Sequence, residues 1–140
     1  MKRCLFYVIV LFMALGAGFA EAQEPEKEKA AVAAATKWLI LIDSWDYGHS
    51  WKEAAEYFRI ATTEEMWVES LKVVRNPLGK LVSREIKSIR YTTSLPGAPD
   101  GEYVVIRFKT CFEKKKSAIE TVTPMIDNDS AWRVSGYYIE

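Results

Sequence analysis

The sequence predicts an α+β fold, in which N-terminal helices pack on a curved four-stranded antiparallel sheet. Two observations carry this prediction. From about residue 30 to residue 74, apolar residues recur at spacings of three and four, the period of an amphipathic helix. From residue 82 onward the spacing is two, and turn-rich segments divide the chain into four strand candidates. Helices followed by an antiparallel meander are typical of this fold class.

The segment 1–22 has the three parts of a secretory signal peptide. Lys2 and Arg3 precede an apolar run over 5–17, and a small-residue A-x-A site follows at 20–22. The apolar run is shorter than the roughly 18 to 20 residues that a membrane-spanning helix needs. We therefore expect cleavage, a mature chain that begins at Gln23, a periplasmic or secreted location, and no stable insertion in a membrane.

The mature chain is expected to be nearly neutral. The whole sequence holds 19 basic and 19 acidic residues, and loss of Lys2, Arg3 and Glu21 leaves 17 and 18. Without a basic excess, we expect no surface for nucleic acid. Cleavage would also remove Cys4 and leave Cys111 as the only cysteine, which excludes an internal disulfide. Because Cys111 lies in a β-prone run, we predict a half-buried strand residue.

A charged lead-in over 23–29 precedes the first helix, which we expect to begin near Ala30 and to end at Gly48. The buried face of this helix would carry Trp38, Leu41, Ile42 and Trp45. Ser50 and Glu53 then have the spacing of a capping box, in which two side chains satisfy free backbone N–H groups at a helix start. This pattern predicts a second helix, with Trp51 on its buried face.

A second capping box over 62–65 predicts a third helix. Its expected buried side consists of Met66, Trp67, Leu71 and Val74. We expect Pro77 to end this helix, because proline disfavours helical geometry in the residue before it.

Four strands are expected over 82–93, 103–112, 117–126 and 132–139. Val104, Ile106 and Phe108 share one face of the second strand. Arg107 and Lys109 share the opposite face. One side of the sheet is therefore core and the other is solvated, and residues 30–140 are expected to form a single domain. A curved sheet wrapped on a long helix resembles the cone of nuclear-transport-factor-2-like, or cystatin-like, proteins, which often leaves a pocket between helices and sheet. This analogy concerns the fold and supplies no function.

Six segments of the mature chain also carry a family resemblance. They lie at 43–51, 75–79, 83–84, 95–103, 120–122 and 132–139, and they begin with DSWDYGHSW and end with WRVSGYYI. Together they resemble domain of unknown function 4019, a family of small exported bacterial proteins. The resemblance implies export from a bacterium and carries over no catalytic residue.

Asp43 is the strongest candidate for a general base. A cone can hold a carboxylate in an apolar pocket, as ketosteroid isomerase does, and Tyr47 follows one turn later as a hydrogen-bond donor. Near a helix break, however, Asp43 could simply accept hydrogen bonds from local backbone N–H groups.

Glu120 shares a strand face with Ala118 and Val122. On the core side this carboxylate must be paired, because an isolated buried charge is very costly. Arg84 or Arg90 could supply the partner, either in a structural ion pair or beside a carboxylate that anchors a ligand. With the helical aromatics, the candidate pocket residues are Trp38, Asp43, Trp45, Tyr47, Trp51, Trp67, Arg84 and Glu120.

His49 is the only histidine, and Asp46 and Glu53 lie close to it in the sequence. Since no second histidine exists to complete a common zinc set, we predict a surface or capping role and no metal site. The chain has no glycine-rich phosphate loop, no G-x-S-x-G elbow, no H-E-x-x-H motif and no cysteine pair. These absences set aside nucleotide, serine-hydrolase and zinc-protease functions, and we expect no cofactor.

Three hypotheses of function remain. The first is a non-enzymatic module whose cone binds a small apolar ligand or a peptide, which requires a concave pocket lined by helical aromatics. The second is an envelope interaction or scaffolding domain, with a homodimer as one form, which requires an exposed apolar patch. The third is an isomerase or hydrolase with Asp43 or Glu120 as the base. It requires a carboxylate that faces a pocket and is not tied to arginine or backbone.

Overall fold

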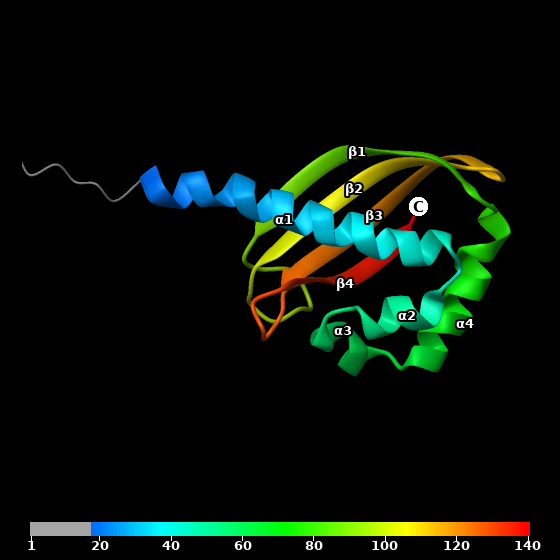
Figure 1. Ribbon diagram of the computed structural model, residues 1–140, viewed down its shortest axis with the longest axis horizontal. Helices are drawn as coiled ribbons and strands as arrows, with labels where there is room; N and C mark the ends of the chain where they lie inside the picture. The colour runs from blue at the N-terminus through cyan, green and yellow to red at the C-terminus, as the bar shows by residue number, and fades with distance from the viewer. Residues whose placement is uncertain (1–17) are drawn as a thin grey trace, which may run out of the picture.

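In the computed structural model, which describes residues 18–140, a long N-terminal helix lies along one face of a four-stranded sheet and three shorter helices follow it (Figure 1). The elements follow in the order α1 (Gly18–Asp43), α2 (Tyr47–Lys52), α3 (Glu56–Ala61), α4 (Glu64–Val74), the 3-10 helix η1 (Asn76–Leu78), β1 (Leu81–Thr92), β2 (Tyr103–Phe112), β3 (Lys115–Ile126) and β4 (Trp132–Ile139). The α+β class is confirmed. The apolar run of the expected signal peptide lies outside the described residues.

The sheet is an antiparallel meander with the spatial order β1-β2-β3-β4, and it curves around α1 (Figure 1). All four expected strands are present: β2 and β4 have the expected bounds, and those of β1 and β3 differ from the expected ones by at most two residues. Pro124 lies in an inner strand, where proline would normally remove a ladder hydrogen bond. The register between β3 and β4 shifts between Thr123 and Pro124, and this irregularity accommodates it.

The core lies between α1 and the concave face of the sheet. Ala31, Ala35, Trp38, Leu39 and Ile42 of α1 are buried, at the spacings of three and four that were expected. The alternation along β2 is also confirmed, because Val104, Ile106 and Phe108 are buried whereas Lys109 is exposed. Cys111 is half-buried in β2, as predicted.

The first helix differs from its expected bounds at both ends. Its described part runs from Gly18 and therefore includes the charged segment 23–29, in which Lys27 forms an ion pair with Glu102. It ends at Asp43, before Gly48, because Trp45 adopts a left-handed backbone conformation with φ of 61°. Gly48 lies inside α2. Among helices of the described residues, none is long and apolar enough to cross a membrane.

The capping box predicted at Ser50 is wrong. Ser50 lies inside α2 and is completely buried, so its hydroxyl is not at a helix start. This hydroxyl donates a hydrogen bond to the carbonyl of Tyr47 and accepts one from the indole N–H of Trp67. The Ser50 side chain therefore links α2 to α4 and does not cap a helix start.

The second capping prediction holds for the side chain of Thr63, which accepts a hydrogen bond from the backbone N–H of Met66 at the start of α4. Trp67 and Leu71 are buried, as expected. Met66 and Val74, however, are 61% and 48% exposed, so their predicted burial is wrong. The reason is that α4 packs mainly on α2, while the ring of Trp67 reaches that of Tyr137 on β4, and a narrow apolar stripe is enough for these contacts.

Candidate functional site

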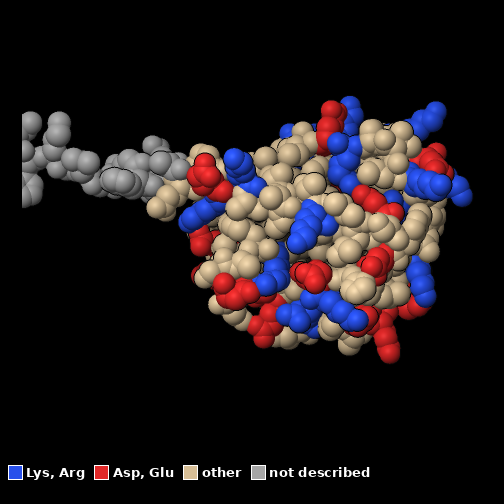
Figure 2. Space-filling view, in the orientation of Figure 1, with Lys and Arg blue, Asp and Glu red and all other residues tan. Residues whose placement is uncertain are grey.

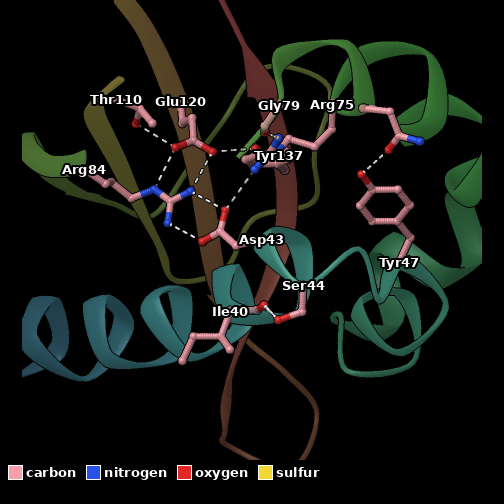
Figure 3. Close-up of polar contacts among 11 residues, drawn as sticks. Ile40, Asp43, Ser44, Tyr47, Arg75, Gly79, Arg84, Thr110, Glu120 and Tyr137 are labelled. Atoms are coloured by element: carbon pink, nitrogen blue, oxygen red, sulfur yellow. Dashed lines mark hydrogen bonds and ion pairs between the residues drawn. The ribbon is translucent and has the colours of Figure 1, made fainter. Parts of the chain in front are cut away.

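A network of charged side chains lies inside the fold, where the end of α1 meets the sheet (Figure 3). Arg84 of β1 stands at its centre. Its Nε donates a hydrogen bond to Glu120 Oε1 over 2.7 Å, and its Nη1 donates to Asp43 Oδ2 over 2.7 Å. Its Nη2 lies 2.9 Å from Asp43 Oδ1 and 3.2 Å from Glu120 Oε2. One guanidinium group therefore holds both carboxylates.

Glu120 lies on β3 with a side chain that is 0% exposed. Besides Arg84, its carboxylate accepts a hydrogen bond from the Thr110 hydroxyl over 2.6 Å and another from the Tyr137 hydroxyl. The donors come from β1, β2 and β4, so all four strands take part. A buried carboxylate is tolerated only when it is paired and hydrogen-bonded in this way.

Arg75, just after α4, supplies the second cation of the network. Its fully buried guanidinium lies between the rings of Trp45 and Phe112, with its carbon 5.0 Å and 4.4 Å from the two ring centres. It donates to the carbonyl of Gly79 and, over 3.4 Å, to Asp43. No hydrogen-bond partner for its Nε is found among the described residues. Ring faces attract a desolvated cation and stabilise Arg75 here.

The electrostatics of the network favour the charged forms of its ion pairs. Burial lowers the pKa of Arg84, but the hydrogen bonds and negative charges of Asp43 and Glu120 raise it above its ordinary value. Burial, together with the charge and hydrogen bond of Glu120, raises the pKa of Tyr137 well above the usual tyrosine range. Two arginines balance two carboxylates, and both carboxylates are bound by arginine. An enzyme with either carboxylate as the base needs one that is free of arginine, and this condition is not met.

A groove of about 640 Å³ lies between α1, α2 and the first half of β4. Its lining is mostly apolar and contains two tryptophans, Trp38 and Trp132, with four charged or titratable side chains. The lining residues are Ala34, Lys37, Trp38, Ile40, Leu41, His49, Glu53, Ala131, Trp132, Arg133 and Val134. On the face where α1 lies, acidic and basic residues are interspersed and neither sign forms a large patch (Figure 2).

A family model described as protein of unknown function (DUF4019) matches residues 34–137. The chain belongs to this family. A search of the curated proteins and a search of the solved structures found no match. The matched part of this DUF4019 chain contains the charged network and the groove, together with β1, β2, β3 and β4 as far as Tyr137. Its resemblance to the cystatin-like cone stays a prediction.

The eight candidate residues of this DUF4019 domain do not gather in one pocket. Trp38 lines the groove, whereas Asp43, Arg84 and Glu120 belong to the charged network. Asp43 is held by arginines and not by local backbone N–H groups, which corrects the alternative expectation for it. Arg84, and not Arg90, is the partner of Glu120.

Three of the other candidates contact residues of other segments. Trp67 packs edge-on against Phe58, with ring centres 4.9 Å apart. Trp51 donates its indole N–H to the carbonyl of Thr62. Tyr47 is buried and donates its hydroxyl to Asn76.

Trp45 is 41% exposed, which corrects its expected place on the buried face of the first helix. Sequence reasoning also missed two residues, Arg75 and Trp132. A lone arginine at a helix end carries no sign that two rings will enclose it, and Trp132 shows only the alternation of a strand residue. His49 is exposed, and its Nδ1 lies 2.7 Å from Asp46 Oδ2.

Proposed function

We propose that this protein is a non-enzymatic module that binds a small, largely apolar ligand in the groove between α1 and β4. The observation that carries the proposal is the groove itself, with Trp38 and Trp132 in its wall. Its volume of about 640 Å³ lies within the 300 to 1,000 Å³ range of sites for small molecules, which are mainly apolar with a few polar groups.

The groove has features of a preformed site. The indole N–H of Trp38 donates to the carbonyl of Ser50 over 2.8 Å, which fixes the ring before any ligand arrives. Arg133 is held by Asp127 and Asp129. Lys37 has no ion-pair partner among the residues that the structure describes, so its ammonium group is the charge best placed to meet a polar end of the ligand.

Ligand binding is favoured over catalysis because the groove and the charged network are separate. Asp43 and Glu120, the two carboxylates considered as bases, are absent from the groove lining and are occupied by Arg84. The histidine and the carboxylate of the groove, His49 and Glu53, lie on the short helix α2 and just after it. A short apolar peptide is the second candidate occupant, because the lining is mostly apolar and also holds Lys37 and Glu53, which could meet the polar groups of a peptide.

We also propose that the protein is exported and that cleavage produces a chain beginning at Gln23. Such a chain would place Pro25 in the first turn of α1, where the missing N–H costs nothing. Glu24 and Glu26 would lie beside it, where acidic side chains are favoured. In a helix that begins at Gly18, Pro25 is an interior residue and removes a hydrogen bond. Intact-mass measurement of the protein recovered from its host checks the new N-terminus.

Binding is tested first by native mass spectrometry of the protein purified gently from its host. We expect a bound mass that is lost on denaturation. The purified protein is then titrated with anilinonaphthalene sulfonate and with short apolar peptides. Ala34→Leu fills the groove with little effect on helix propensity, and Trp132→Ala removes one wall.

Both groove variants should weaken dye binding about tenfold, a change of about 1.4 kcal/mol. Trp45→Ala is the matched control, because Trp45 is a partly exposed tryptophan outside the groove, and it should bind the dye like the wild type. The proposal would be overturned if the protein carried no bound mass and did not bind the dye. It would also be overturned if all three variants lost dye affinity equally. Binding of peptides but not of the dye would select the second occupant.

A further inference from the structure

The two edge strands of the sheet, β4 and β1, differ in how far other segments cover them. β4 is covered in its first half, because the backbone N–H of Ala55 donates to the carbonyl of Val134 over 2.8 Å and α3 lies against the strand. β1 forms the opposite edge, has 12 residues and is paired only with β2 (Figure 1). Every residue over 85–90 is exposed. An uncovered edge of this length is a template for another strand.

The exposed part of β1 contains two isoleucines that face the helix side of the sheet. Ile86 pairs with Phe108 and Ile89 pairs with Ile106, and both partners belong to the buried face of β2. The register shift between Ile86 and Ser88 keeps both isoleucines on this side. They are nevertheless 45% and 37% exposed, because nothing in the described chain covers this edge.

The sequence of β1 is complementary to itself when it is read in opposite directions. An antiparallel pair centred on Lys87 and Ser88 places Ile86 opposite the partner's Ile89. The same register places Glu85 opposite the partner's Arg90. Glu85 and Arg90 both belong to the face away from the helices, because their neighbours on β2 are Lys109 and Val105. A twofold axis repeats each pair, which gives two apolar and two opposite-charge contacts.

We propose that β1 is a homodimer interface, in which the β1 strands of two copies pair antiparallel about Lys87 and Ser88. The occupant is a second copy of this chain because the charges and the isoleucines of β1 match themselves in one register. Strand addition of this kind draws affinity from main-chain hydrogen bonds and specificity from alternate side chains. Since the dimer would leave only the β4 edges, which are partly covered, assembly stops at two copies.

Lys87 sets a limit on the strength of this interface. It lies next to the twofold axis, where the two copies place like charges near one another, and an edge lysine normally opposes strand pairing. The wild-type dimer should therefore dissociate on dilution. Lys87→Ala should tighten it. The two interpretations of β1 differ in the wild type, which dimerises if β1 is an interface and stays monomeric if Lys87 keeps β1 a protected edge.

The test uses charge reversal on the full mature chain, followed by sedimentation and native mass spectrometry over a concentration series. Glu85→Arg alone places arginine opposite arginine, and Arg90→Glu alone places glutamate opposite glutamate. Each should weaken the homodimer about tenfold or more, because like charges at an interface are costly. An equal mixture of the two variants restores both opposite-charge pairs and should form a heterodimer, recognised by its mass.

The matched control is Glu69→Arg, which reverses an exposed charge on α4 and not on β1, and should leave dimerisation unchanged. Circular dichroism of each variant confirms that it is folded. A wild-type chain that stays monomeric over the whole series would overturn the proposal. So would a dimer that Glu85→Arg and Arg90→Glu leave as tight as the wild type, or a mixture without heterodimer.

Discussion

Arg84 of β1 and Glu120 of β3 form a two-point ion pair across the intervening strand β2, with Nε 2.7 Å from Oε1 and Nη2 3.2 Å from Oε2. The same guanidinium group binds Asp43 at the end of α1. The pair thus joins the first helix to the sheet in the concave interior. Removal of one partner leaves an uncompensated buried charge, and this is costlier than the net contribution of the intact pair.

Glu120→Gln should lower the free energy of unfolding by about 3 kcal/mol. The amide keeps the volume of the side chain but removes the negative charge that faces Arg84. Asp43 still binds Arg84, which keeps the loss at the lower end of the range for broken buried pairs. Urea unfolding at neutral pH measures the change. Glu69→Gln on the exposed face of α4 is the control and should change stability by less than about 1 kcal/mol; similar losses in the two variants would contradict the prediction.

Ser50→Ala should destabilise the protein by about 1 to 3 kcal/mol. The substitution leaves the buried indole N–H of Trp67 without its acceptor, the Ser50 hydroxyl at 2.9 Å. Ser44→Ala provides the comparison, because the Ser44 hydroxyl also bonds to a helix carbonyl, that of Ile40, but is exposed. Thermal and urea unfolding should show a clear loss for Ser50→Ala and almost none for Ser44→Ala. Equal stability of the two variants would mean that the buried hydroxyl contributes nothing.

The strands could be predicted from the sequence nearly to the residue, whereas the boundaries between helices could not. In the second half of the chain, alternating apolar residues and turn-forming segments act over the same short range as the strands themselves. In the first half, the break at Trp45 depends on a left-handed backbone conformation of a large residue, which no local pattern announces. Ser50 and Glu53 have the spacing of a capping box, but Ser50 is buried inside α2 by tertiary packing and does not cap a helix.

The charged network was predictable only in part. A carboxylate in a core strand must be paired, and the sequence offered Arg84 or Arg90 as the partner of Glu120. Asp43 joined the network from the end of α1, which the sequence could not place beside β1. Trp132 became a wall of the groove only because β4 returns to α1. Residues that meet through the long-range topology are the ones that the sequence left unassigned.

Tyr137→Phe tests the raised pKa of Tyr137. At neutral pH the variant loses a hydrogen bond to a buried carboxylate and should be about 1.5 to 3 kcal/mol less stable. In the wild type, the unfolded chain ionises this tyrosine above about pH 10, whereas burial keeps it protonated in the folded chain. Wild-type stability therefore declines above this pH by a contribution that the variant lacks. The difference between the two proteins, measured by urea unfolding, should narrow as the pH rises from 9 to 11; a constant difference would show that the folded-state pKa is not raised.

Asp129 should titrate with a pKa of about 2, below its ordinary value of 3.8. Arg133 is the main cause, because its Nη2 donates to Oδ2 over 2.7 Å, and the backbone N–H of Ala131 adds a bond to Oδ1. A lowered folded-state pKa means that the stabilisation is present above about pH 4 and is lost as the pH falls toward 2. Asp129 is exposed, so solvent keeps the effect on unfolding small, and NMR titration of the carboxyl carbon is the better measurement.

Arg133→Gln should return the pKa of Asp129 toward 3.8, whereas Arg59→Gln, an exposed change on α3, should leave it near 2. A wild-type value near 3.8 would mean that the Arg133 contact is not maintained in solution.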